Sequence, residues 1–160
     1  VQPYDWAKFL HERLDTIQPH APLDGLKNGG YKLVYTDKPT SFIKAMEGVR
    51  HGLDLTFSLG MNVTESGKTA RVHWMSPAFK AGLTSGETIL AVNDMTYTSD
   101  RLRHAVTDAQ KDPKQDIRLV VKSGEHINAV SISYHGGLRY PHLERIDGTS
   151  DYLSAIYAPR

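Results

Sequence analysis

The 160-residue sequence contains no cysteine. Disulfide bridges, thiolate nucleophiles and cysteine-ligated metal sites are therefore excluded, but this absence does not decide the cellular compartment. An excess of one charge is lacking too, because 19 Lys and Arg residues stand against 18 Asp and Glu residues, for a formal net charge of +1. Proteins that bind nucleic acids usually carry a strong basic excess, so we expect no nucleic-acid partner.

Long apolar runs are also missing. The longest stretch without Asp, Glu, Lys or Arg extends from residue 126 to residue 138, which is too short to span a bilayer. Hydrophobic residues make up 39% of the chain and charged residues 23%, and both values are ordinary for a globular protein. We therefore expect one compact domain with extensions, and no membrane span.

The apolar spacing predicts both helices and strands. Near-helical spacing predicts a first amphipathic helix along the stripe Trp6, Phe9, Leu10, Leu14 and Ile17, and residues 19–30, rich in Pro and Gly, indicate a linker. Strict alternation over residues 53–63 predicts a strand with one buried face, bent at a glycine. Further strands are expected at 31–36, 69–74, 88–92, 117–121 and 127–134, and helices after Ser76, from about Ser99, and weakly at 152–157. This order of elements predicts an α+β fold.

Four motifs in this order resemble a PDZ domain of the bacterial kind. The carboxylate-binding loop of that family is usually hydrophobic-Gly-hydrophobic, and here it reads Ser58, Leu59, Gly60 and Met61. Residues 76–83 (SPAFKAGL) resemble the family's turn and short helix, and residues 86–94 (GETILAVND) resemble its next strand. Residues 119–124 with 130–132 resemble its closing hairpin. The resemblance implies a partly open β-barrel or sandwich of about five to six strands with two helices over residues 49–134.

The flanking segments are similar to glycyl aminopeptidases of the PDZ-containing zinc metallopeptidase type. They are Asp5-Trp6 with Phe9-Leu10, and residues 22–26 (PLDGL), 29–36 (GGYKLVYT) and 134–145 (YHGGLRYPHLER). In that bacterial family a thermolysin-like catalytic domain precedes the PDZ domain. The resemblance implies that this chain is a carboxy-terminal piece, in which residues 1–48 end the helical catalytic region and form a linker. Residues 135–160 would be a tail that packs on a neighbouring domain. Periplasmic, secreted and cytoplasmic locations are all compatible with this family.

The resemblance also assigns a peptide-binding groove. Backbone N–H groups of Leu59, Gly60 and Met61 would hold a terminal carboxylate, while a partner strand would add to the sheet edge beside them. The groove residues would be Asn62, Val63, Ser99, Arg103 and Val106, and the residues of the same helix that face the core would be Leu102, Ala105 and Ala109. The implied partners are a peptide or protein carboxy-terminus and the catalytic domain of the same polypeptide.

The predicted groove departs from well-known peptide-binding PDZ domains. Ser99 stands where His is common, and Arg103 stands where an apolar residue is common. Arg103 would either pair with an acidic ligand side chain or fill the groove. Peptide capture and structural packing with a vestigial groove are therefore two alternatives, and fold alone does not choose between them. A PDZ domain of another bacterial protease class is a third alternative, against which the flanking segments speak.

The zinc motif of the resembled family is not found in this sequence. His-Glu-x-x-His places two ligands at i and i+4 on one helix, whereas the nearest match, residues 11–15 (HERLD), ends in Asp15. The other histidines are scattered, with no compact ligand spacing. We therefore expect no catalytic residue, no metal site and no cofactor in this chain, and we expect zinc in the missing catalytic domain.

Overall fold

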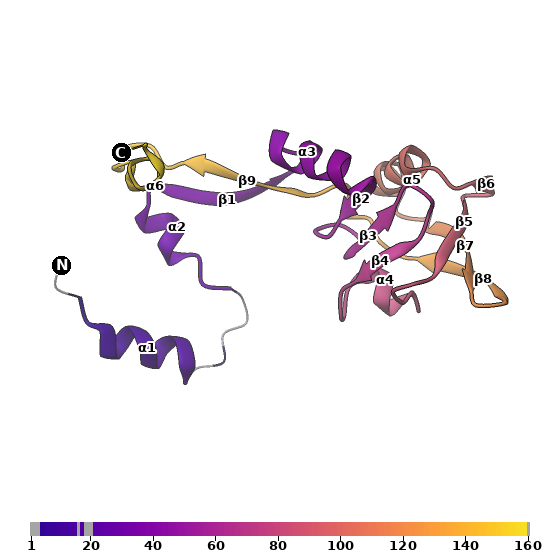
Figure 1. Cartoon of the computed structure of the whole chain (residues 1–160), viewed down its shortest axis with the longest axis horizontal. Helices are drawn as coiled ribbons and strands as arrows, with labels where there is room; N and C mark the ends of the chain where they lie inside the picture. The colour runs from indigo at the N-terminus through magenta and orange to yellow at the C-terminus, as the bar shows by residue number, and fades with distance from the viewer. Residues whose placement is uncertain (1–3, 16, 18–20, 160) are drawn as a thin grey trace. The chain divides into compact units, whose positions relative to one another are not determined.

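The computed structural model describes residues 4–15, 17 and 21–159 (Figure 1). The chain divides into two compact units. The terminal unit consists of Val1–Leu33 with Leu143–Arg160, and the central unit consists of Val34–His142. The predicted PDZ region, residues 49–134, lies inside the central unit, which also takes in residues on both sides of it.

Helices dominate the terminal unit. They are α1 (Trp6–Leu14), α2 (Asp24–Asn28) and α6 (Tyr152–Tyr157). Asp5 caps α1 by accepting the backbone N–H of Lys8, and Asp151 caps α6 in the same way. The first predicted helix ends at Leu14 rather than at Ile17, and α2 lies inside the expected linker, of which it forms five residues. Residues 19 and 20, at the start of that linker, lie outside the described residues.

A two-stranded sheet pairs β1 (Tyr31–Thr36) with β9 (Tyr140–Arg145). The sequence predicted β1 but not β9, because Pro141 argues against a strand. The pairing is compatible with this proline, since β9 has one neighbour and therefore needs only one side of its backbone for hydrogen bonds.

The central unit contains two further sheets in the described residues (Figure 1). The three-stranded sheet has the order β2-β3-β4, and the four-stranded sheet has the order β6-β5-β7-β8. The strands are β2 (Gly52–Leu55), β3 (Met61–Thr64), β4 (Thr69–Val72), β5 (Thr88–Val92), β6 (Met95–Thr96), β7 (Ile117–Ser123) and β8 (His126–Ile132). Helices α3 (Ser41–Arg50), α4 (Pro77–Lys80) and α5 (Ser99–Lys111) complete the unit. The α+β prediction is confirmed.

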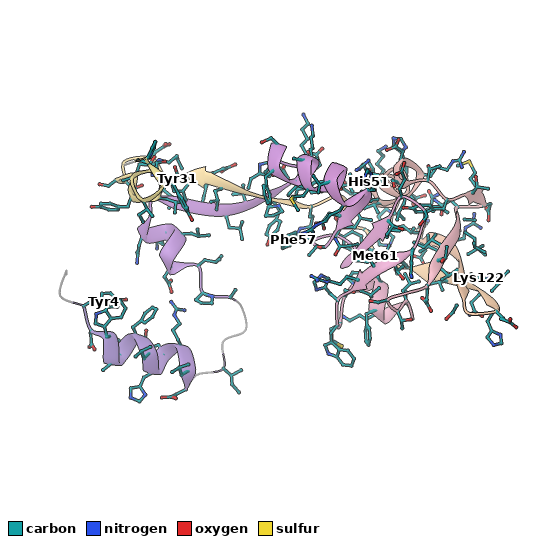
Figure 2. The ribbon with its side chains drawn as sticks, viewed as in Figure 1. Tyr4, Tyr31, His51, Phe57, Met61 and Lys122 are labelled. Atoms are coloured by element: carbon teal, nitrogen blue, oxygen red, sulfur yellow. The ribbon has the colours of Figure 1, made fainter. Side chains whose placement is uncertain are left out.

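The core of the central unit follows the apolar periodicity of its strands and of α5. One face of each sheet contributes the alternate residues, and α5 contributes a helical stripe. The buried side chains include Leu53, Leu55, Leu59, Met61, Val63, Ile89, Leu102, Val106, Ile117, Leu119 and Ile132. In Figure 2, Met61 lies inside the unit, whereas Phe57 and Lys122 lie toward its opposite ends. Among the described residues, no helix is both long and apolar enough to cross a membrane.

The alternating stretch over residues 53–63 is two strands and a turn, rather than one bent strand. The N–H groups of Ser58 and Gly60 both donate to the carbonyl oxygen of Leu55, at 3.1 and 2.9 Å, which reverses the chain between β2 and β3. Gly60 has φ +74°, and a Cβ there would lie 2.1 Å from the Cβ of Ser76. Glycine is therefore needed both for the backbone conformation and for the close contact with Ser76.

Candidate functional site

The predicted carboxylate loop lies between β2 and β3, and several of its backbone N–H and C=O groups are already hydrogen-bonded within the chain. The carbonyl oxygen of Leu59 accepts from Ala78, that of Gly60 accepts from His73, and the N–H of Gly60 is committed to Leu55. Ser58, Leu59 and Met61 are buried, at 5%, 0% and 0% exposure. The expectation that Gly60 offers a free N–H group to a ligand is therefore wrong in this conformation.

The predicted groove also required an unpaired edge on β3, to which a peptide strand could add. The structure shows no such edge on β3. Every residue of β3 has a partner on β2, from Met61 opposite Leu55 to Thr64 opposite Gly52. On its other side β3 pairs with β4. A peptide therefore finds no unpaired edge on β3, which is the middle strand, whereas β2 and β4 are the outer strands of this sheet. Of the two predicted groove residues on β3, Asn62 is half-buried and Val63 is fully buried.

Helix α5 begins after Thr98, whose side chain accepts the N–H of Arg101. The predicted groove residue Ser99 is half-buried, and its hydroxyl lies 3.3 Å from that of Tyr97. Val106 was expected to face a peptide, but it is completely buried in the core. This correction follows from the width of the apolar stripe on α5, which includes Val106 as well as the three residues that were expected to face the core.

Among the predicted groove residues, Arg103 forms ion pairs with two carboxylates. Its Nη2 lies 3.2 Å from Oε2 of Glu47 on α3, and its Nη1 lies 3.0 Å from Oδ1 of Asp100. The other carboxylate oxygen of Glu47 accepts the backbone N–H of Asp54 on β2, at 2.8 Å. The Glu47 carboxylate therefore bonds an outward-facing N–H of the outer strand and holds the guanidinium of α5. These bonds connect α3, β2 and α5 through one half-buried cluster.

Tyr140, near the carboxy-terminal end of the central unit in the sequence, also belongs to this cluster. Its side chain is 2% exposed, although it lies only two residues before the unit ends. Burial raises the pKa of the Tyr140 hydroxyl, and the carboxylates of Glu47 and Asp54 add to this rise, while Arg103 opposes it. No hydrogen bond of regular geometry reaches this hydroxyl from the residues the structure describes. Burial also acts to lower the pKa of Arg103, but its neighbours, Tyr140 first, outweigh this and raise it. The guanidinium therefore stays charged.

The chain between β8 and β9 runs along α5 and reaches the predicted carboxylate loop. Nδ1 of His135 lies 2.8 Å from the carbonyl oxygen of Ala109, and a Cβ on Gly137 would meet the side chain of Gln110 at 2.3 Å. The backbone N–H of Arg139 donates to Oγ of Ser58, at 3.0 Å. Residues 135–140, which we call the closing segment, thus contact α5 and the loop where a ligand was expected.

No local pattern in the sequence marked Glu47 or Tyr140 as a site residue. Glu47 lies 56 positions from Arg103. Both residues are defined by contacts that form only when distant segments come together.

The zinc-like sequence in α1 forms an intrahelical pair rather than a ligand set. Nδ1 of His11 contacts the Asp15 carboxylate one turn further on, and both side chains are well exposed. No group of three or more His, Asp or Glu side chains with metal-binding geometry occurs within residues 4–15, 17 and 21–159. The i, i+4 spacing here produces a hydrogen-bonded pair at the surface.

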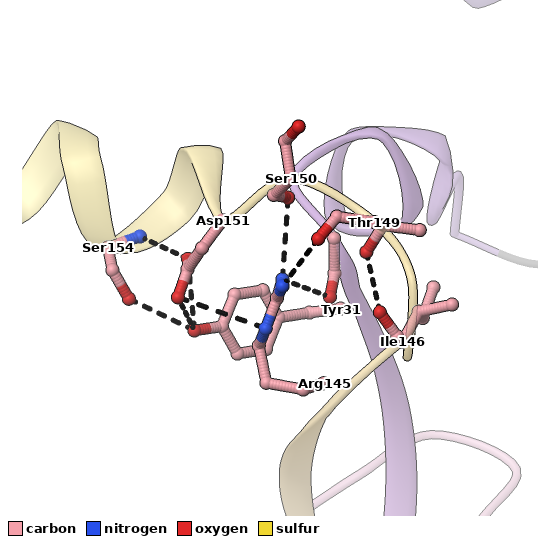
Figure 3. Close-up of polar contacts among 8 residues, drawn as sticks. Tyr31, Arg145, Ile146, Thr149, Ser150, Asp151 and Ser154 are labelled. Atoms are coloured by element: carbon pink, nitrogen blue, oxygen red, sulfur yellow. Dashed lines mark hydrogen bonds and ion pairs between the residues drawn. The ribbon is translucent and has the colours of Figure 1, made fainter.

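A second polar cluster lies within the terminal unit and joins two predicted flanking motifs (Figure 3). The Arg145 guanidinium donates to the carbonyl oxygens of Gly30 and Thr149, at 2.8 and 2.7 Å, and lies over the ring of Tyr31. The Tyr31 hydroxyl in turn donates to the carboxylate of Asp151. A Cβ on Gly30 would lie 2.2 Å from Nη1 of Arg145, so only glycine admits the guanidinium here.

Comparisons with known proteins find structures of similar fold, but they do not assign the chain to a family. No family model and no curated protein matches the chain. A solved aminopeptidase N family protein from Idiomarina loihiensis matches over 90% of this chain with a TM-score of 0.57 and 13% identity. The chain spans 25% of that protein's length. The HtrA3 PDZ domain, solved with the phage-derived ligand FGRWV, matches over 74% of this chain and 96% of its own length, with 14% identity and a TM-score of 0.34. The chain is thus similar in fold to a segment of an aminopeptidase N family protein.

Proposed function

We propose that this chain is a non-catalytic, PDZ-like module of a larger aminopeptidase-type protein, and that its own residues close its groove. The observation that carries the proposal is the cluster of Glu47, Arg103 and Tyr140 between β2 and α5. Glu47 bonds the N–H of Asp54, where the backbone carbonyl of an added strand would otherwise bind. Tyr140 fills the adjoining space with a buried aromatic ring.

The fold similarity to a segment of an aminopeptidase N family protein supports the larger context. The resemblance of the flanking motifs to glycyl aminopeptidases supports it independently. In this proposal, hydrolysis and the zinc ion belong to a catalytic domain outside the chain. We expect the chain alone to leave glycyl-p-nitroanilide intact, with or without added zinc. Release of p-nitroaniline that depends on zinc and tracks the purified chain would contradict this part.

Exposed apolar side chains in the terminal unit favour a packing role. Trp6 and Leu10 on α1 are 58% and 50% exposed, and Tyr152, Ile156 and Tyr157 on α6 are 60%, 74% and 79% exposed. Large contiguous patches of such side chains are uncommon on monomeric proteins and mark interaction surfaces. We propose that the catalytic domain of the same polypeptide covers them, and we expect the isolated chain to self-associate in sedimentation experiments.

Peptide titration followed by NMR tests the closed groove. A pentapeptide with an apolar carboxy-terminal residue, free or amidated, is added to the isotope-labelled chain. We expect the amide signals of Asp54 and of α5 to stay in place with both peptides. In the Tyr140→Ala variant, which empties the space beside α5, the same signals are expected to shift. Shifts of these signals in the unaltered chain would overturn closure in cis and establish the groove as an open peptide site.

A further inference from the structure

A second hollow lies beside the turn between β2 and β3, away from the Glu47 cluster. Its volume is about 520 Å³, and its walls include Tyr35, Phe57, His73, Ser76 and Arg139. All of these residues belong to the central unit. Phe57, labelled in Figure 2, is 45% exposed, although the alternating pattern of its segment predicted a buried side chain. The proposed function leaves this hollow without a role.

The hollow combines an aromatic wall with one cation. The rings of Tyr35 and Phe57 lie 5.5 Å apart, and the Arg139 guanidinium lies over Tyr35, 4.5 Å from the ring centre. Stacking fixes the plane of the guanidinium and leaves the N–H groups at its edge free to donate. Within the part of the chain that the structure describes, no acidic side chain lines this hollow, and Arg139 has no ion-pair partner.

His73 adds an unused polar atom to the same wall. Its backbone N–H is bound to Gly60, which holds the residue against the turn. Its Nε2 atom is buried and lacks a hydrogen-bond partner among the described residues. A buried polar atom without a partner is costly, and natural structures contain few of them. Because this atom is buried, a ligand oxygen reaches it only if the ring turns toward the hollow, and that contact would remove the cost.

We propose that this hollow binds a carboxylate attached to an apolar or aromatic group. The Arg139 guanidinium would hold the carboxylate through two parallel hydrogen bonds, His73 would provide a further polar contact, and Tyr35 with Phe57 would cover the apolar part. A single guanidinium stacked on an aromatic ring matches a monoanion better than a strongly hydrated phosphate. The same chemistry occurs at a peptide carboxy-terminus and in a small arylalkanoic acid.

This site is separate from the groove that Tyr140 closes. Arg139 and Tyr140 are consecutive, and in extended chain consecutive side chains point to opposite sides. Tyr140 is buried beside α5, whereas the side chain of Arg139 is exposed in the hollow. The hollow also needs no N–H group of the turn, since that of Gly60 is already bonded to Leu55.

NMR titration of the chain with three pairs of probes tests the proposal. The probes are 3-phenylpropanoate and its amide, N-acetyl-phenylalanine and its amide, and the pentapeptide Gly-Ala-Gly-Ala-Phe with a free or amidated end. We expect the acids to shift the signals of Phe57, His73 and Arg139, and the amides to bind about tenfold more weakly or not at all. Preference for the pentapeptide acid would identify a peptide carboxy-terminus as the ligand, and preference for phenylpropanoate would identify a free acid.

Two matched variants make the test specific. Arg139→Gln keeps a planar group near Tyr35 but removes the charge, and it is expected to weaken binding of the acids at least about tenfold. Arg71→Gln removes an exposed cation of β4 that does not line the hollow, and it is expected to change nothing. Absence of binding, equal binding of acids and amides, or unchanged binding in Arg139→Gln would overturn the proposal. Shifts at Asp54 and α5 instead would locate the ligand in the groove, which would overturn the closed-groove proposal as well.

Discussion

Oε2 of Glu47 lies 3.2 Å from Nη2 of Arg103, and this ion pair joins α3 to α5 beside the outer strand β2. The Glu47 side chain is 13% exposed and that of Arg103 is 32% exposed, so water screens the pair only in part. Because Glu47 also accepts the N–H of Asp54, removing its carboxylate breaks two bonds at once. The pair is therefore the best single point at which to weaken the closed groove.

The first prediction concerns the stability that Glu47 provides. Glu47→Ala leaves the exposed Asp100 as the acidic partner of Arg103 among the described residues, and it removes the side-chain acceptor of the Asp54 N–H. We expect a loss of about 2 kcal/mol in the free energy of unfolding, as for a hydrogen bond to a charged group. Urea unfolding followed by circular dichroism measures this loss.

Asp108 provides the control for this prediction. It pairs with Lys111 at i, i+3 on the exposed face of α5, so Asp108→Ala is expected to cost less than about 0.5 kcal/mol. Equal losses for Glu47→Ala and Asp108→Ala would show that the Glu47 cluster is an ordinary surface pair.

The second prediction concerns the turn at Gly60. An alanine there must adopt φ +74° and place its Cβ against Ser76. We expect Gly60→Ala to cost about 3 kcal/mol or more, from overpacking combined with a left-handed backbone. Gly124→Ala is the matched control, because Gly124 has φ +60° but nothing within 4 Å of the added Cβ. It should show only the backbone cost, of about 1 kcal/mol. Similar losses at both positions would mean that the contact with Ser76 relaxes freely.

Local sequence signals predicted much of this fold, and the exceptions have physical causes. Ser76 and Thr98 cap their helices within a few residues, and the alternation around Leu53 and Val63 reflects one buried face, so short segments were sufficient. Phe57 kept the alternation but lies in a turn, because two N–H groups bond to Leu55 there. The pairing of Met61 with Leu55 on β2 and the burial of Tyr140 depend on tertiary contacts. No local pattern specifies such contacts, so the sequence left peptide capture and a vestigial groove as two alternatives.

The third prediction is a loss of stability in alkali. Burial raises the pKa of Tyr140, and likewise those of Tyr97 and Tyr134, above the ordinary value of 10.0. The folded state therefore holds these protons more tightly than the unfolded state, and their contribution is complete below pH 10.0. It is lost as the pH rises from there through the raised values. Urea unfolding at a series of pH values, with tyrosinate absorbance, should show stability falling above this point.

Tyr140→Phe isolates the contribution of one hydroxyl to this alkaline loss. The hydroxyl has no regular hydrogen-bond partner among the described residues, so its removal is expected to be nearly neutral at pH 7. The variant should lose less stability than the unaltered chain above pH 10.0, because one raised pKa is gone. An identical alkaline slope in both proteins would show that Tyr140 titrates normally.

The last prediction concerns Arg145 in the terminal unit. Its planar guanidinium reaches the carbonyl oxygens of Gly30 and Thr149 together, and a lysine ammonium lacks that fork. We expect Arg145→Lys to speed hydrogen exchange about tenfold at Tyr31 and in α6, since these segments are held by that side chain (Figure 3). Exchange in the core strands β5 and β7 should stay unchanged. Arg118→Lys is the control, because the exposed Arg118 side chain pairs with Asp94 at the surface of the central unit. A uniform rise in exchange across both units, or none near Tyr31, would contradict a local role for Arg145.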